Sequence, residues 1–213
     1  MVHSFPTRRS SDLNLTGHKL PTAYPSRRVW LHVSVEDASG AVVFVSGALG
    51  EGGAIRGNDN DADATRYEPH YAEIASADQV QIYEPILADA KGAVTTGLLS
   101  AVRYIKDNRL LPRGFDKQRA GADIAVRGTA LEDPDFAGGS DRVRYRIPAG
   151  TATGPFRVVA TLDYQPIGFR WAMNLAQIDT PETGRFGRLF RAIAPASTAT
   201  LSRATRSEER RVG

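Results

Sequence analysis

The chain of 213 residues contains no cysteine. This absence excludes disulfide bonds, thiol catalysis, thiolate metal sites and the C-x-x-C-H motif through which haem is attached covalently. The chain also has no run of about 18 apolar residues, so no segment is predicted to span a membrane. Hydrophobic residues nevertheless make up 41% of the sequence, which predicts a folded domain with a buried core rather than a disordered chain.

The two ends of the chain are related at the level of DNA. Residues 6–13 and residues 206–213 can be written as one DNA string and its reverse complement, and that string resembles a sequencing adapter. We therefore expect residues 1–13 and 206–213 to be non-native, and residues 14–205 to be one domain cut from a longer chain. The end segments hold five of the 27 basic and three of the 24 acidic side chains, so the net charge of the remainder is about +1 rather than +3. A nearly neutral domain gives no support to nucleic-acid binding.

Two-residue alternation of apolar and polar side chains is the strongest pattern in residues 14–205. It runs through residues 29–35, stops at a turn, and resumes at 41–46, which predicts a β-hairpin. Further strands are expected at 79–87, where Gln79, Gln81 and Tyr83 form the polar face, and at 142–147 and 156–164. Residues 94–108 are ambiguous, because Leu98, Leu99, Val102 and Ile105 fit a helical face whereas Thr95, Thr96 and Gly97 do not.

After Pro166 the apolar spacing lengthens to that of a helix. Phe186, Leu189, Phe190 and Ile193 then lie on one helical face, with Thr183 as the expected N-cap. Several short strands bounded by Gly- and Asp-rich turns predict a mainly β fold, an antiparallel immunoglobulin-like sandwich with a short C-terminal helical appendage.

An acidic loop is the first candidate binding site. Asp59, Asp61 and Asp63 alternate along the loop and could offer oxygen ligands to Ca²⁺. The loop is not an EF-hand, because counting from Asp59 the sixth position is Ala64 and the twelfth is His70. The alternative interpretation is a solvated polar loop without a metal.

The histidines do not follow a metal-ligand spacing. His32 lies in the first predicted strand, where cross-strand packing is its expected role. We expect His70 to pair with Glu68 or to hydrogen-bond the backbone. His18 differs, because a glycine before it and a proline after it indicate an irregular segment that could hold the imidazole toward a partner.

Residues 103–119 are rich in basic side chains, but Asp107 and Asp116 interrupt them. This pattern favours a face toward an acidic partner or solvent over a nucleic-acid surface. The sequence has no G-x-S-x-G elbow, and its glycines match neither the dinucleotide-binding nor the P-loop spacing. We expect no enzymatic activity from this piece of chain and leave the activity of a longer protein open.

Several strings resemble, in the same order, the C-terminal β-rich region of bacterial multihaem c-type cytochromes. They cover residues 14–22, 25–33, 68–71, 78–84, 106–115 and 164–171. The resemblance implies that a haem-bearing part with haem c preceded this piece, and that the domain packs on its own N-terminal haem domain without carrying covalent haem. It implies a periplasmic or exported protein, and leaves the redox partner unknown.

The resemblance also assigns a role to His18. A Gly-His followed by Pro can supply a distal axial imidazole to a haem of the preceding domain. Ala23 stands where such proteins more usually have Gly, which affects the loop after the proline because Ala lacks the backbone freedom of Gly. An apolar surface that contacts the haem domain is expected to include Trp30, Phe169 and Trp171. The alternative function is a Ca²⁺-stabilised extracytoplasmic recognition or adhesion module.

Overall fold

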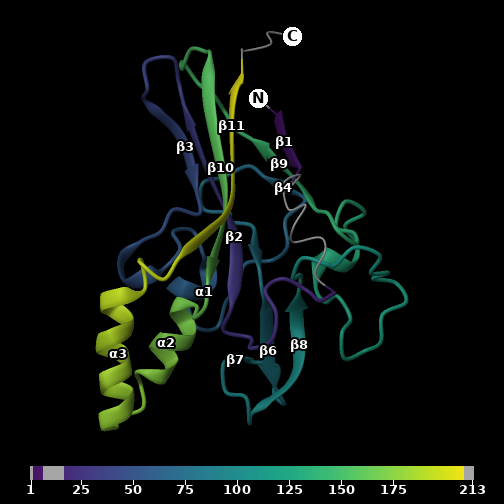
Figure 1. The fold of residues 1–213 in the computed structure, drawn as a ribbon, viewed down its shortest axis with the longest axis vertical. Helices are drawn as coiled ribbons and strands as arrows, with labels where there is room; N and C mark the ends of the chain where they lie inside the picture. The colour runs from purple at the N-terminus through teal and green to yellow at the C-terminus, as the bar shows by residue number, and fades with distance from the viewer. Residues whose placement is uncertain (1, 7–16, 209–213) are drawn as a thin grey trace.

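The computed structural model describes residues 2–6 and 17–208. The molecule is elongated, with long strands running along one half and shorter strands, loops and helices gathered in the other half (Figure 1). The described residues form three sheets. The predicted non-native segments lie partly within this range: residues 2–6 and 206–208 are in strands, whereas residues 7–13 and 209–213 and the predicted domain start at residue 14 lie outside it. The predicted domain boundaries stay a prediction.

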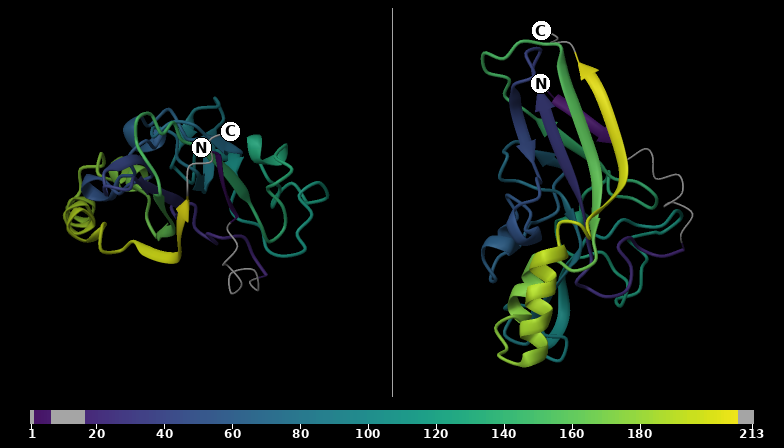
Figure 2. Two further views of the ribbon diagram at one scale, coloured as in Figure 1. Left: turned by 90° about the horizontal axis from the view of Figure 1, so that it is seen from above. Right: turned by 60° about the vertical axis from the view of Figure 1, so that its left-hand side comes forward.

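The largest sheet has the strand order β11-β10-β2-β3, and β5 pairs with the N-terminal end of β2. All its pairs are antiparallel. β2 and β3 are the predicted hairpin, and β10 lies on the other side of β2 (Figure 2). The strands are β2 Arg28–Glu36, β3 Val42–Ser46, β5 Ile82–Tyr83, β10 Phe156–Gln165 and β11 Ala199–Glu208.

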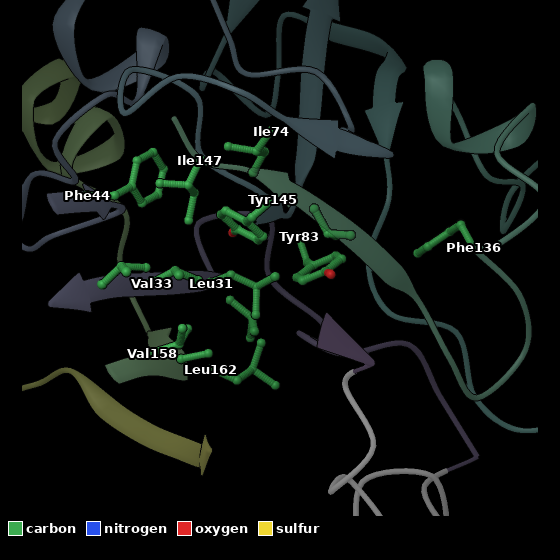
Figure 3. Packing of buried hydrophobic residues seen from close by; sticks show 14 of the residues in the cluster. Leu31, Val33, Phe44, Ile74, Tyr83, Phe136, Tyr145, Ile147, Val158 and Leu162 are labelled. Carbon is green, nitrogen blue, oxygen red and sulfur yellow. The ribbon is translucent and has the colours of Figure 1, made fainter. Parts of the chain in front are cut away.

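A smaller sheet faces the first one and completes the sandwich. It has the order β1-β9-β4, with β1 Val2–Pro6, β9 Arg142–Arg146 and β4 Glu73–Ile74, and its β4–β9 pair is parallel. β9 alternates as predicted, with exposed arginines and a buried Val143 and Tyr145. The apolar core fills the space between the sheets (Figure 3). It includes Leu31 and Val33 from β2, Val158 and Leu162 from β10, Tyr145 from β9, and Ile147 just after β9.

The third sheet and the helices extend the sandwich at one end. The sheet has the order β7-β6-β8, and the helices follow β10 or lie in the loop before β4 (Figure 1). The strands are β6 Pro85–Asp89, β7 Val94–Thr95 and β8 Ala101–Asp107; the helices are α1 Asp59–Ala62, α2 Phe169–Leu175 and α3 Pro181–Ile193. Among the residues that the structure describes, Glu51–Gly53 and Thr129–Leu131 form 3-10 turns. Within the described ranges, no helix has the length and apolar character needed to cross a bilayer.

The prediction of a mainly antiparallel β fold with a short C-terminal helix is confirmed. The ambiguous residues 94–108 contain no helix and form two strands, β7 and β8, joined by a turn at 96–100. The expected N-cap of the C-terminal helix is wrong by one turn: Thr180 caps α3 by accepting the Thr183 N–H with its side chain, and the Thr183 hydroxyl oxygen accepts the Thr180 N–H, which completes a capping box. Pro181 at the first turn explains the earlier start, since its fixed φ and missing N–H suit that position.

Two expectations about exposure are wrong. Gln81 and Tyr83 are fully buried and do not face solvent. The reason is that the chain crosses from the first sheet to the third between Tyr83 and Pro85 and is covered on both sides there. Trp30 is 1% exposed and donates its indole N–H to the Gly47 carbonyl at 2.9 Å. Phe169 and Trp171 are half-buried. The large exposed apolar side chains lie elsewhere, and they include Leu98, Leu99, Val102 and Ile124.

Candidate functional site

His18 lies with its side chain exposed at the start of a segment that is held in place immediately afterwards. Its Nδ1 is 3.2 Å from the carbonyl oxygen of Lys19. Leu20 exchanges two backbone hydrogen bonds with Leu110, at 2.9 and 2.8 Å. The imidazole is therefore carried by a short stretch of chain whose position is fixed by the loop that follows β8.

Lys19 strengthens this attachment through a buried ion pair. Its ammonium group donates to Asp107 Oδ2 at 2.8 Å, and both side chains are nearly inaccessible. Arg109 binds the same carboxylate through Nε and Nη2, at 2.9 and 2.8 Å. Burial opposes ionisation of Asp107, but the two cations outweigh it and lower the pKa of this carboxyl group. The carboxylate at the end of β8 thus fixes the residue next to His18.

A second histidine, His70, lies at the centre of a buried polar network. Its Nε2 is 3.1 Å from Asp133 Oδ2 and 3.9 Å from Asp141 Oδ1. Its Nδ1 is 2.7 Å from Gln81 Nε2 and 3.2 Å from Asn108 Nδ2. The expected pairing with Glu68 is wrong. Glu68 instead accepts hydrogen bonds from the Tyr71 hydroxyl and the Asp59 amide.

The backbone determines the tautomer of His70. Gln81 Oε1 accepts the Tyr71 N–H at 2.8 Å, and Asn108 Oδ1 accepts the Glu84 N–H at 3.0 Å. Both side-chain amides therefore present their NH₂ groups to Nδ1 of His70, which must accept with its lone pair. The ring proton lies on Nε2 and is donated to Asp133. Burial lowers the pKa of His70 to about 4, so the ring is neutral near pH 7.

Asp141, which directly precedes β9 of the facing sheet, completes the network. Its Oδ2 accepts the Tyr83 hydroxyl at 2.6 Å, and its Oδ1 accepts the Arg142 amide at 2.7 Å. Burial raises the pKa of Asp141 to about 6. Hydrogen bonds from Tyr83 and Arg142 act in the opposite direction and keep that increase limited.

His70, Asp133 and Asp141 are close enough to hold a metal ion, since one ligand atom from each lies within 4.8 Å of the others. The hydrogen bonds around the ring argue against this use. A metal ion bound to Nε2 would displace the ring proton from that atom. Nδ1 could not take up this proton, because it already accepts hydrogen bonds from two NH₂ groups, so the ring would have to become an imidazolate anion. Metal-bound histidines usually donate their other N–H to a neighbour instead. The arrangement fits a structural network better than a metal centre.

The three acidic residues of the candidate calcium loop face protein partners. Asp61 forms a buried ion pair with Arg28 at 2.8 Å and also accepts the Ile55 amide. Asp59 pairs with Arg66, and Asp63 accepts hydrogen bonds from its own loop. Among the described residues, these carboxylates do not form a group of three converging ligand atoms. The Ca²⁺ site at this loop stays a prediction.

The basic stretch at 103–119 is divided by the fold. Lys106 is fully buried and pairs with Glu84 at 3.1 Å, and Lys117 donates to the backbone carbonyls of Ala130 and Asp133. The remaining exposed cations of this stretch are Arg103, Arg113 and Arg119. Only part of the predicted basic face is therefore available to a partner.

The sequence did not predict the network around His70, because its members come from segments that are far apart in the chain. The alternation pattern places Gln81 on a solvent-facing side of its strand. Asp133 before Pro134, and Asp141 two positions after Gly139, resemble ordinary turn residues. One signal was present: the strings that resemble multihaem cytochromes contain most of the buried polar side chains. These are Lys19, Ser26, Arg28, Glu68, His70, Gln81, Glu84, Lys106, Asp107, Asn108 and Gln165.

No family model and no curated protein matches the chain. Among solved structures, the chain is similar to a penta-heme cytochrome c552 from Thermochromatium tepidum, with a TM-score of 0.48 and 16% sequence identity. The match covers 91% of this chain and 33% of that chain, so this chain spans about a third of the length of the solved protein.

Proposed function

We propose that residues 14–205 form an accessory β domain of an exported multihaem c-type cytochrome, and that His18 supplies a distal axial imidazole to a haem of its N-terminal domain. The observation that carries the proposal is the exposed imidazole on a firmly attached segment. In this proposal the domain is not itself an enzyme. The full protein transfers electrons in the periplasm or outside the cell.

The attachment of the segment suits a ligand role. An axial ligand must keep its position when the oxidation state of the iron changes, and a mobile loop would not do so. The Lys19–Asp107 pair and the Leu20–Leu110 hydrogen bonds restrict the two residues after His18. His32, by contrast, lies within β2 and is partly covered by its neighbours, so it does not offer an equivalent imidazole.

The hydrogen bonding of His18 also suits a ligand role. Its contact with the Lys19 carbonyl is through Nδ1, which favours the tautomer with the proton on Nδ1 and the lone pair on Nε2. A haem bound there would supply one-electron transfer through its iron, at a potential set partly by the axial ligand. His18 would hold that iron from one side, while the β scaffold fixes its position.

The first experiment is to recover the complete gene from source DNA with long reads. Several C-x-x-C-H motifs before residue 14 are the expected result, because the resemblance implies an upstream haem domain. A complete gene that encodes only further β modules would contradict the proposal and favour the recognition module.

The second experiment uses the complete protein and tests the ligand directly. His18→Ala should convert one haem from low spin to high spin in the absorption and electron paramagnetic resonance spectra. His18→Met should restore a low-spin haem with a higher potential, since Met ligation raises the potential relative to His. His32→Ala is the matched control and should leave the spectra unchanged. Unchanged spectra and potentials in His18→Ala would overturn the assignment.

A further inference from the structure

A cavity of about 600 Å³ lies between the third sheet and the loop formed by residues 122–127. Leu87 from β6 and residues 101–104 of β8 form one side, and Leu98 and Pro25 contribute further apolar surface. Leu98 is 48% exposed and Val102 is 60% exposed, so the cavity opens to solvent through apolar side chains. Its size is within the range of small-molecule and cofactor sites.

The charged side chains of this cavity favour an anionic occupant. Arg103 and Arg127 line it together with a single acidic residue, Asp123. In the part of the chain that the structure describes, neither guanidinium is among the ion pairs formed within 4 Å. Arg127 is directed by a hydrogen bond from Nη2 to the Ala122 carbonyl at 3.2 Å. Arginine binds carboxylates through two parallel hydrogen bonds, which suits an occupant with carboxylates at its edge.

The cavity is built on the same segment as His18. Lys19 donates to the carbonyl of Ala125, which lies between the lining residues Asp123 and Arg127. Asp107, the ion-pair partner of Lys19, exchanges two backbone hydrogen bonds with Arg127. The attachment that fixes His18 therefore also fixes one wall of the cavity.

We propose that this cavity receives the carboxylate-bearing edge of a tetrapyrrole, with Arg103 and Arg127 binding the carboxylates and Leu98 and Val102 covering the apolar part. The inference rests on the proposed function, because it identifies the occupant as the propionate edge of a haem in the N-terminal domain. It adds a docking surface that is separate from the iron ligand.

The probe is metal-free protoporphyrin IX, which has both carboxylates but no iron for His18 to coordinate. Its binding to the 213-residue chain is measured by porphyrin fluorescence. Arg103→Gln and Arg127→Gln should each weaken binding by about tenfold, as expected for the loss of a charge-assisted hydrogen bond. Arg119→Gln, which removes an exposed arginine outside the cavity, should leave binding unchanged. The dimethyl ester of the same porphyrin should bind as weakly as the arginine variants.

Equal binding of the free acid and the ester, or an equal loss in Arg119→Gln, would overturn the inference, because binding would then be independent of the cavity. Circular dichroism of each variant checks that the fold is intact. His18→Ala should bind the metal-free porphyrin as the unaltered chain does. The two proposals therefore fail separately: the haem spectrum of the complete protein tests His18, and the metal-free porphyrin tests the cavity.

Discussion

The sandwich and the region beside the third sheet are stabilised in different ways. Between the two facing sheets the inward side chains of β2, β9 and β10 are apolar, whereas the region that joins β5, β6 and β8 buries charges and amides. Apolar packing tolerates substitution at constant volume, while a buried hydrogen-bond network depends on every partner. We therefore expect substitutions in the polar region to destabilise the protein more than substitutions in the apolar core. The polar region is also the part to which the segment of His18 is attached.

Removing one charge from a buried ion pair should change the free energy of unfolding more than any other substitution considered. Lys106→Met leaves Glu84 in the interior without its cation and should lower the free energy of unfolding by about 3–5 kcal/mol. Adding Glu84→Gln removes the isolated charge and should recover a large part of the loss. Urea unfolding followed by circular dichroism measures both. A single variant within 1 kcal/mol of the parent would show that the pair does not stabilise this region.

The His70 network should make stability depend on pH, with two opposite contributions. The pKa of His70 is lowered to about 4, so the unfolded state binds its proton more readily and this residue adds stability as pH rises from about 4 to 6.5. The pKa of Asp141 is raised to about 6, so the folded state holds its proton more readily and this residue removes stability as pH rises from about 4 to 6. Each contribution is about 3 kcal/mol, and they nearly cancel.

Single substitutions should separate the two contributions. Relative to the parent, Asp141→Asn should become more stable as pH rises through this interval, and His70→Gln should become less stable, each by about 3 kcal/mol. Thermal unfolding at pH 4, 5, 6 and 7 provides the comparison. Parallel plots of stability against pH for the parent and both variants would mean that neither residue has a different pKa in the folded and the unfolded state.

A substitution in the apolar region should lower the free energy of unfolding by a smaller amount, and this loss should be the same at every pH. Val33 is fully buried between the sheets, and Val33→Ala should lower the free energy of unfolding by about 2 kcal/mol through lost burial and a small cavity. The same urea experiment at pH 5 and pH 7 should give the same difference. A pH-dependent difference would imply that the two regions are coupled.

The apolar region could be predicted from the sequence, because alternation is a local property. Residues 29–35, 142–147 and 156–164 each showed their buried face directly, and the structure places those faces together. The polar region could not be predicted in the same way. Gln81 is polar by composition but is buried because His70, Tyr71 and Asp141 come to it from other segments. Such burial depends on long-range contacts that no window of sequence contains.

The candidate sites show the same difference. The irregular segment around His18 was visible from the neighbouring glycine and proline, but its attachment depends on Asp107, which is 88 positions farther along the chain from Lys19. For Asp61, alternation suggested a metal ligand, whereas the fold brings Arg28 to it from 33 positions away. Local spacing identifies candidate ligands, and long-range contacts decide which of them already have protein partners.

The smallest expected effect is a gain in stability beside the polar region. Ala23 adopts a φ of 61°, in the left-handed region that glycine enters without steric cost. Ala23→Gly should therefore raise the free energy of unfolding by about 0.5–1 kcal/mol, because the relief of backbone strain exceeds the added entropy of the unfolded chain. Ala38→Gly, at an exposed turn residue without a positive φ, is the matched control and should not stabilise the protein. Equal changes in the two variants would show that the backbone at Ala23 is not strained, and that this loop accepts alanine as readily as glycine.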